Sequence, residues 1–137
     1  MGDQPGTVLP GDHRPCDIRE IASSYQWLVG YGQENLASGL WEEDELAGHP
    51  HQWVPFAAPV SGGYAFVDHR PGATYGHVYE MAISAGDTDG RLWATSPTGL
   101  FDDLATVLET GTSFLCYRPH VGVRPSGQRC LRWRVVA

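Results

Sequence analysis

Four consecutive acidic residues at positions 42–45 form the densest charge in this sequence. They are Glu42, Glu43, Asp44 and Glu45. Carboxylates gathered in this way attract Arg and Lys side chains and steer a basic partner during encounter, an effect that salt weakens. The segment is therefore a candidate surface that imitates phosphate and docks on a basic protein. A solvated loop or helix face accounts for the same residues without a partner, and the sequence leaves both interpretations open.

A second acidic pair, Asp87 and Asp89, lies in the segment GDTDG at 86–90. Spaced aspartates are typical of calcium loops, but an EF-hand needs Gly at its sixth position and Glu at its twelfth, and Gly90 falls at the fourth. The segment instead predicts the turn of a hairpin. We group its two carboxylates with residues 42–45 as candidate partner-binding residues.

Other residues with catalytic or metal-binding chemistry are poorly placed for it. Pro50 separates His49 from His51, and no third metal ligand stands at a suitable spacing. Asp68 and His69 are neighbours, and neighbours on a strand point to opposite faces, so adjacency does not make them a dyad. The sequence also contains no lysine, HExxH or Gly-x-Ser-x-Gly motif. We expect no enzyme activity, metal or cofactor; a small hydrolase whose His and Asp residues converge in space is the alternative.

Charge is distributed unevenly along the chain. Nine arginines against 16 acidic residues give a formal net charge of −7. Residues 1–110 hold four arginines and all 16 acids, a balance of −12, whereas residues 111–137 hold five arginines and no acid. An acidic body favours a basic protein over nucleic acid as partner. The basic segment predicts no nucleic-acid platform, because Trp133 points to the strand face opposite Arg132 and Arg134.

Length and composition indicate one globular domain. The chain has 137 residues, of which 42% are hydrophobic and 18% charged, which is enough for a core of its own. No apolar run approaches the roughly 18–20 residues of a membrane helix, and the N-terminus lacks the features of a secretory signal. The three cysteines form no CxxC pair. We therefore expect a cytoplasmic protein that does not bind membranes, and we leave its oligomeric state open.

The domain is expected over residues 17–137. Residues 1–16 carry Gly, Pro and Asp without a period and predict a flexible lead. Residues 33–52 are consistent with either a short helix or an ordered loop.

The first helix is predicted at 17–29. Asp17 and Glu20 have the spacing of a capping box, and apolar residues then recur at helical intervals. Gly30 and Gly32 are expected to end this helix.

After residue 52 the pattern changes to short strands and turns. Apolar runs predict strands at 53–57, 64–67, 77–83, 91–95, 114–117 and 130–136. Pro55 indicates a strand edge or a bulge in the first of them, and the second is apolar on both faces, as a central strand would be. Because strands arrive in runs rather than alternating with helices, we expect an α+β fold with a largely antiparallel mixed sheet.

The clearest helix is predicted at 97–110, and we expect it to pack on the sheet like the first. Ser96 is a good N-cap, Pro97 suits the first helical position, and Gly111 suits the C-terminal end. Phe101 belongs to its apolar pattern. If Phe101 is fully buried, Phe101→Ala should lower the free energy of unfolding by about 3–5 kcal/mol.

The order of these motifs resembles the SUKH superfamily, which includes the fungal Smi/Knr cell-wall regulators and many bacterial immunity proteins of polymorphic toxin systems. The resemblance rests on an aromatic-Val-Pro-Phe segment, a strand that ends in Asp before Pro-Gly, and a Gly before the next strand. The residues concerned are Trp53, Pro55, Phe56, Asp68, Pro71, Gly72 and Gly76. Ser96 before the late helix, and Trp27 with Gly30 in the first, fit the same pattern, so the resemblance covers about residues 17–137.

The resemblance implies an α+β fold, a protein-binding role, no cofactor and no universal catalytic residue. The function we expect from it is that of an immunity protein, which binds a cognate bacterial toxin such as a nuclease and blocks it. The alternative is a regulatory or scaffold protein of the same fold with a partner that is not a toxin. The matching residues listed above are expected to shape the fold rather than to perform chemistry.

Overall fold

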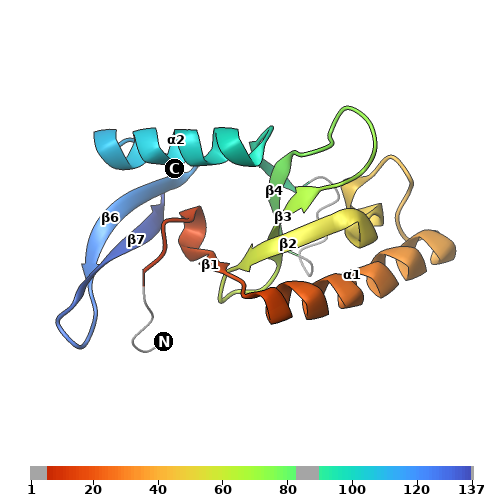
Figure 1. The fold of residues 1–137 in the computed structure, drawn as a ribbon, viewed down its shortest axis with the longest axis horizontal. Coiled ribbons are helices and arrows are strands. Elements are labelled where there is room, and N and C mark those ends of the chain that lie inside the picture. The colour runs from red at the N-terminus through yellow and green to blue at the C-terminus, as the bar shows by residue number, and fades with distance from the viewer. Residues whose placement is uncertain (1–5, 83–89, 137) are drawn as a thin grey trace.

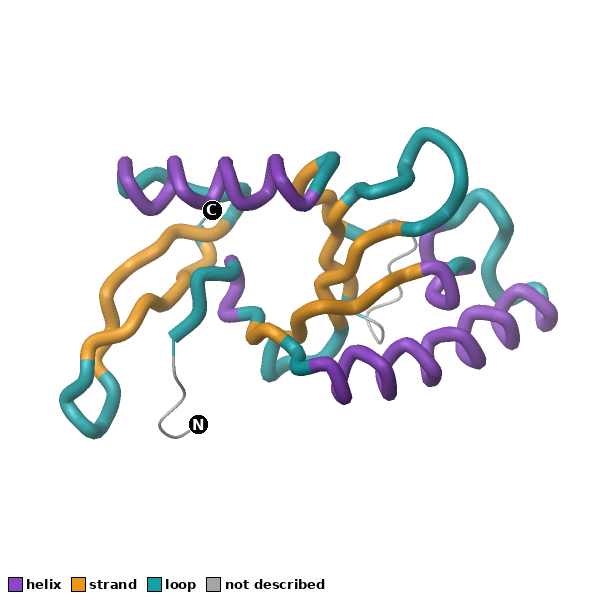
Figure 2. The backbone as a smooth tube through the Cα atoms, in the orientation of Figure 1, coloured by secondary structure: helices purple, strands orange, loops and turns teal. Residues whose placement is uncertain are grey.

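Five antiparallel strands form the centre of the structure (Figures 1 and 2). The computed structural model describes residues 6–82 and 90–136. The strands lie side by side in sequence order, each antiparallel to its neighbour: β1 (Arg14–Pro15), β2 (Trp53–Ala58), β3 (Tyr64–Asp68), β4 (Val78–Met81) and β5 (Arg91–Ala94). With two helices, α1 (Ile18–Ser38) and α2 (Pro97–Thr110), the expected α+β fold is confirmed.

Helix α1 begins at the predicted capping box. The Asp17 carboxylate accepts the backbone N–H of Glu20 at 2.8 Å, and the Glu20 carboxylate accepts the backbone N–H of Asp17 at 3.0 Å. Two of the otherwise unpaired N–H groups at the helix start are thereby satisfied.

The prediction that α1 ends at Gly30 and Gly32 is wrong. The helix continues to its C-cap at Gly39, which has the left-handed conformation. Gly32 is buried, and a Cβ built there would lie 2.7 Å from Nδ1 of His51. Glycine at this position therefore permits close packing of the helix rather than a turn. Beyond α1, the segment left open by the sequence forms two short 3-10 helices, Leu46–Gly48 and Pro50–Gln52.

Residues 6–16 differ from the flexible lead that was expected. Leu9 is buried in the core, Pro10–Asp12 form a 3-10 helix, and β1 pairs with the end of β2. The sequence of this segment has no periodic pattern, and contacts with distant strands fix its position. The indole Nε1–H of Trp133, for example, donates to the carbonyl oxygen of Thr7 at 3.0 Å.

Both faces of the five-stranded sheet are buried, and different elements cover each. The face that we call the aromatic face carries Trp53, Phe66 and Met81, and it packs against Leu28 of α1 and the 3-10 helix Leu46–Gly48. The face that we call the mixed face carries Ala57, Ala65, Val78 and Trp93, and it packs against Leu9, α2 and Trp133. The central strand β3 contributes to both faces, as its sequence predicted.

Helix α2 has the predicted bounds, but Phe101 lies outside its buried face. Ser96 Oγ accepts the backbone N–H of Gly99 at 3.0 Å, and Gly111 ends the helix with φ of +70°. The buried residues are Leu100, Leu104 and Val107. Phe101 is 54% exposed, so the prediction that it is a core residue is wrong.

The last two strands form a separate ribbon along which α2 lies (Figure 1). They are β6 (Tyr117–Val123) and β7 (Arg129–Val135), so β6 begins where the predicted strand at 114–117 was expected to end. Pro119 is tolerated because it pairs with Trp133, whose N–H points away from β6 toward Asp12. Such a pair exchanges no ladder hydrogen bonds, and proline therefore removes none.

Candidate functional site

The acidic segment forms an ordered turn directly after α1. The backbone N–H of Glu45 donates to the carbonyl oxygen of Glu42 at 3.1 Å, and the Glu45 carboxylate accepts the N–H of Glu42 at 3.1 Å. Glu42, Glu43 and Asp44 are exposed, whereas Glu45 is half-buried. Three of the four predicted carboxylates are thus presented to solvent, and the fourth closes the turn. Asp87 and Asp89, the other predicted partner-binding residues, lie outside the described residues.

The aromatic-Val-Pro-Phe segment forms most of β2. Trp53 is fully buried and stacks on Phe66, with ring centroids 3.8 Å apart. Pro55 is buried beside a register shift between β2 and β3, which is consistent with the bulge that was one of the two expectations for this proline. Phe56 packs against the mixed face.

Asp68 and its following loop connect β3 to β4. As predicted, β3 ends at Asp68, which is fully buried. Its carboxylate accepts the backbone N–H of Arg70 at 2.8 Å and the side-chain Nε–H of Arg70 at 3.0 Å. Pro71 and Gly72 are exposed in the loop, and Gly76 has φ of +85°, a conformation that favours glycine. These residues shape the chain and bring no reactive groups together.

An aromatic pair with one exposed ring lies on α1. Trp27 is 51% exposed and stacks on Tyr31, one turn later, with ring centroids 4.8 Å apart. An open groove of about 460 Å³ adjoins it, lined by Trp27, Ala58, Pro59, Gly62, Gly63 and Tyr64. The groove therefore runs between α1 and the turn that connects β2 to β3.

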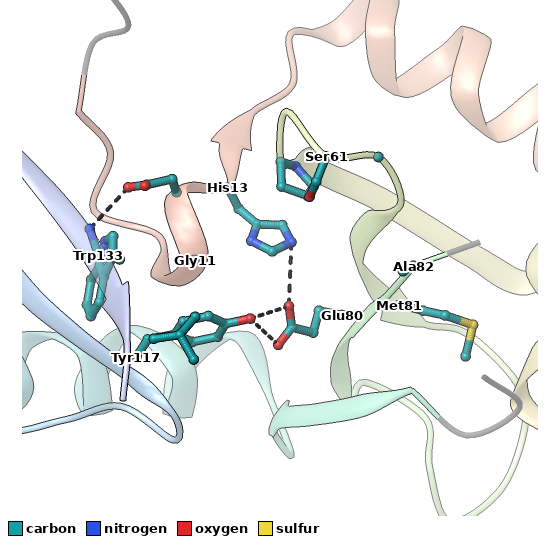
Figure 3. Close-up of a pocket in the computed structure, with 12 residues that line it drawn as sticks. Gly11, His13, Ser61, Glu80, Met81, Ala82, Tyr117 and Trp133 are labelled. Carbon is teal, nitrogen blue, oxygen red and sulfur yellow. Dashed lines mark hydrogen bonds and ion pairs between the residues drawn. The ribbon is translucent and has the colours of Figure 1, made fainter. Parts of the chain in front are cut away.

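Four ionisable side chains meet on the mixed face, and three of them come from distant parts of the chain (Figure 3). The Tyr117 hydroxyl donates to the two carboxylate oxygens of Glu80, at 2.7 and 2.8 Å. Nε2 of His13 lies 3.8 Å from Oε2 of Glu80, and Nε of Arg91 lies 3.6 Å from Oε1. His13 comes from the N-terminal segment, Glu80 from β4 and Tyr117 from β6.

The surroundings of His13 fix the position of its proton. Nδ1 lies 2.8 Å from the carbonyl oxygen of Pro10. A carbonyl oxygen only accepts, so Nδ1 carries the hydrogen and Nε2 of the neutral ring holds a lone pair. The side chain is buried and contacts the Trp93 ring edge-on, with centroids 4.9 Å apart. Burial lowers the pKa of His13, and this outweighs the opposing effects of the Pro10 carbonyl and Glu80.

Tyr117 is kept in its neutral form. Burial raises the pKa of its hydroxyl, and the hydrogen bond to the Glu80 carboxylate raises it further. Gly11 has φ of +65°, and a Cβ there would lie 2.9 Å from the Tyr117 ring. Glycine at this position therefore lets the ring reach Glu80.

A cavity of about 330 Å³ opens beside this cluster. Its lining includes His13, Glu80 and Tyr117, together with Asp12, Ser61 and Trp133. Pro59 and Gly62 line both this cavity and the groove beside α1, so the turn after β2 borders the two hollows.

Sequence analysis missed His13, Glu80 and Tyr117 as a group. His13 was assigned to the lead and Tyr117 to a short strand, and nothing local links either to Glu80. The available signal was Glu80 itself, the only acidic residue within the apolar pattern at 77–83. A carboxylate in such a strand requires partners from elsewhere when the sheet is buried on both faces.

Within residues 6–82 and 90–136, no three His, Cys, Asp or Glu side chains gather as a metal site would require. His49 instead hydrogen-bonds the Glu43 carbonyl oxygen and the Gln52 side chain, which ties the acidic turn to the 3-10 helix that follows. In the same described part of the chain, neither helix is long and apolar enough to cross a membrane.

Comparisons of this chain with protein-family models, with curated proteins and with solved structures gave no match.

Proposed function

We propose that this protein is a binding module for a basic protein partner, and that it acts as an immunity protein of the SUKH type, which blocks a cognate toxin by direct binding. The observation that carries the binding role is the exposed Trp27, which stacks on the half-buried Tyr31 beside the groove on α1.

Large aromatic side chains at the surface are costly to leave in water and are enriched among residues that dominate binding energies. Stacking on Tyr31 holds Trp27 in one orientation, so little conformational entropy remains to be lost on binding. The adjoining groove offers a partner side chain an apolar place between Trp27 and Tyr64.

Charge around this pair supports a basic partner. Glu20 lies seven residues before Trp27 and Glu34 seven residues after it, and two helical turns place both acids on the same side of α1 as the tryptophan. Arg19 is the only basic residue of the helix. The exposed carboxylates at 42–44 extend the acidic surface past the helix end. Such a surface would steer a nuclease-like toxin, whose cleft must be basic to hold phosphate.

The narrower proposal, immunity, rests on the motif order from Trp53 to Gly76 and on the acidic body. It is tested by co-expression with the product of the neighbouring reading frame, followed by affinity purification and a growth assay. Stable co-purification with restored growth supports immunity. A complex without growth rescue would favour the regulatory or scaffold alternative.

The binding surface is tested separately on the purified complex. Trp27→Ala should weaken binding by more than about 30-fold, the loss expected when a residue worth about 2 kcal/mol is removed. Phe101→Ala is the matched control, because Phe101 is an aromatic of similar exposure on the other helix. The complex should also weaken as the salt concentration rises. Equal affinity for the Trp27→Ala variant and wild type would contradict the α1 surface.

A further inference from the structure

We infer that the cavity beside Glu80 is a binding site for an organic cation that carries N–H groups, either a guanidinium or a primary ammonium (Figure 3). This inference rests on the contacts within the cavity and goes beyond the binding role proposed for α1.

Two hydrogen-bond acceptors face each other in this cavity. Oε2 of Glu80 and Nε2 of His13 are 3.8 Å apart. The Pro10 carbonyl oxygen holds the imidazole hydrogen on Nδ1, so Nε2 carries a lone pair. A carboxylate offers about four acceptor positions, and the Tyr117 hydroxyl occupies only part of this capacity. Glu80 Oε2 and His13 Nε2 therefore share no hydrogen bond, and a donor placed between them could bind both.

One nitrogen bearing two hydrogens fits this separation. Hydrogen bonds of about 2.9 Å from a single nitrogen reach two acceptors that lie 3.8 Å apart. A cationic nitrogen is favoured over a neutral amide because the Glu80 side chain is only 15% exposed, and a charged partner offsets the cost of burying its carboxylate. Arg91 approaches the other oxygen and does not line the cavity, so a ligand would share Oε2 with the Tyr117 hydroxyl and not with Arg91.

The walls of the cavity also suit a cation. The rings of Tyr117 and Trp133 line it, and aromatic faces attract guanidinium and ammonium groups. Asp12 adds a second carboxylate, which is held in place because it accepts a hydrogen bond from the backbone N–H of Trp133 at 3.2 Å. The volume of about 330 Å³ lies at the lower end of the range of small-molecule sites. Such a space accommodates an alkylguanidinium or the end of an arginine side chain.

The first experiment titrates the full chain with methylguanidinium and, as a neutral control of similar shape, with methylurea. Binding is followed by the NMR signals of Trp133, a residue that lines the cavity. We expect saturable shifts with methylguanidinium and at least tenfold weaker binding of methylurea. Equal affinities for the two compounds, or shifts that never saturate, would overturn the inference.

Variants then place the ligand within the cavity. Glu80→Gln keeps the shape and removes the charge, and it should weaken methylguanidinium binding at least tenfold. Because this buried change can also affect folding, a second variant alters the exposed Ser61. Ser61→Arg supplies a tethered guanidinium and should compete with the free ligand, whereas Ser61→Gln should not. Unchanged binding by both Glu80→Gln and Ser61→Arg would place the ligand elsewhere.

A comparison of agmatine with the peptide Gly-Arg-Gly distinguishes the two sources of a guanidinium. Tighter binding of agmatine identifies a free small molecule as the occupant, and tighter binding of the peptide identifies a protein side chain. Either outcome supports the site. If neither agmatine nor the peptide binds, the inference is contradicted.

Discussion

Both faces of the five-stranded sheet are buried, but different kinds of contact hold them. On the aromatic face, Trp53 and Phe66 stack almost parallel, with 9° between their planes. On the mixed face, the carboxylate of Glu80 accepts a hydrogen bond from Tyr117 on β6, and its charge lies close to His13. The buried, stacked rings of the aromatic face stabilise the fold. The mixed face joins three distant segments, and its contacts leave room for a ligand.

The largest expected effect is the loss of an aromatic ring from the first face. Phe66→Ala should lower the free energy of unfolding by about 3–5 kcal/mol, because it removes a fully buried ring that stacks on Trp53. Phe101→Ala, at an exposed position, should cost less than about 1 kcal/mol. Urea denaturation measures both, and similar losses would contradict the assigned faces.

The next effect concerns the polar contact of the mixed face. Tyr117→Phe removes the hydroxyl that donates to Glu80 and should cost about 1.5–3 kcal/mol, as expected for a hydrogen bond to a charged group. Tyr64→Phe makes the same chemical change on the aromatic face, where Tyr64 is half-buried. If the mixed face depends on its polar contacts, the first substitution should cost clearly more than the second.

A third test separates two glycines of α1. Gly32→Ala should destabilise the protein by about 1–3 kcal/mol, since its Cβ would fall within 2.8 Å of the His51 backbone N and the Pro50 ring. Gly30→Ala meets nothing within 4 Å and should stabilise by about 0.4–1 kcal/mol. If α1 packs as described, thermal unfolding shows a lower Tm than wild type for Gly32→Ala and a higher Tm for Gly30→Ala.

The smallest effect is the pH dependence contributed by the mixed face. Burial lowers the pKa of His13, so its contribution to stability is present above about pH 6.5, its unfolded value, and is lost as the pH falls below it. The pKa of Tyr117 is raised, so its contribution is present below about pH 10 and is lost as the pH rises further. Tyr117 is half-buried, and solvent screens part of this contribution.

Urea unfolding at several pH values tests this dependence, with Tyr117→Phe as the reference. Stability of the wild type should decline above about pH 10 more steeply than that of the variant. The same slope in both proteins would show that Tyr117 does not contribute to alkaline unfolding.

Local patterns in the sequence predicted the elements that short-range chemistry determines. The capping box at Asp17 and the Ser96 cap of α2 each depend on residues within a few positions of one another. The antiparallel sheet was also predictable, because its strands follow one another in the sequence rather than alternating with helices.

Features set by long-range packing were not predictable in this way. Gly32 looks like a helix terminator until the 3-10 helix at 50–52 is known to pack against it. The exposure of Phe101 depends on which side of α2 meets the core. For the candidate sites, the sequence identified the acidic turn at 42–45, whereas the Glu80 cluster needed the tertiary structure because its members are separated by tens of residues.

The hydrogen bond from Trp133 to Thr7 spans 126 positions along the chain. The bond from Tyr117 to Glu80 spans 37, whereas Trp53 and Phe66 meet across a single hairpin. Loop-closure entropy rises with the length of chain enclosed, and contacts of high sequence separation slow folding. We therefore expect the β2–β3 hairpin with its stacked rings to form early, and the cavity around Glu80 to be completed last, when β7 docks on the N-terminal segment.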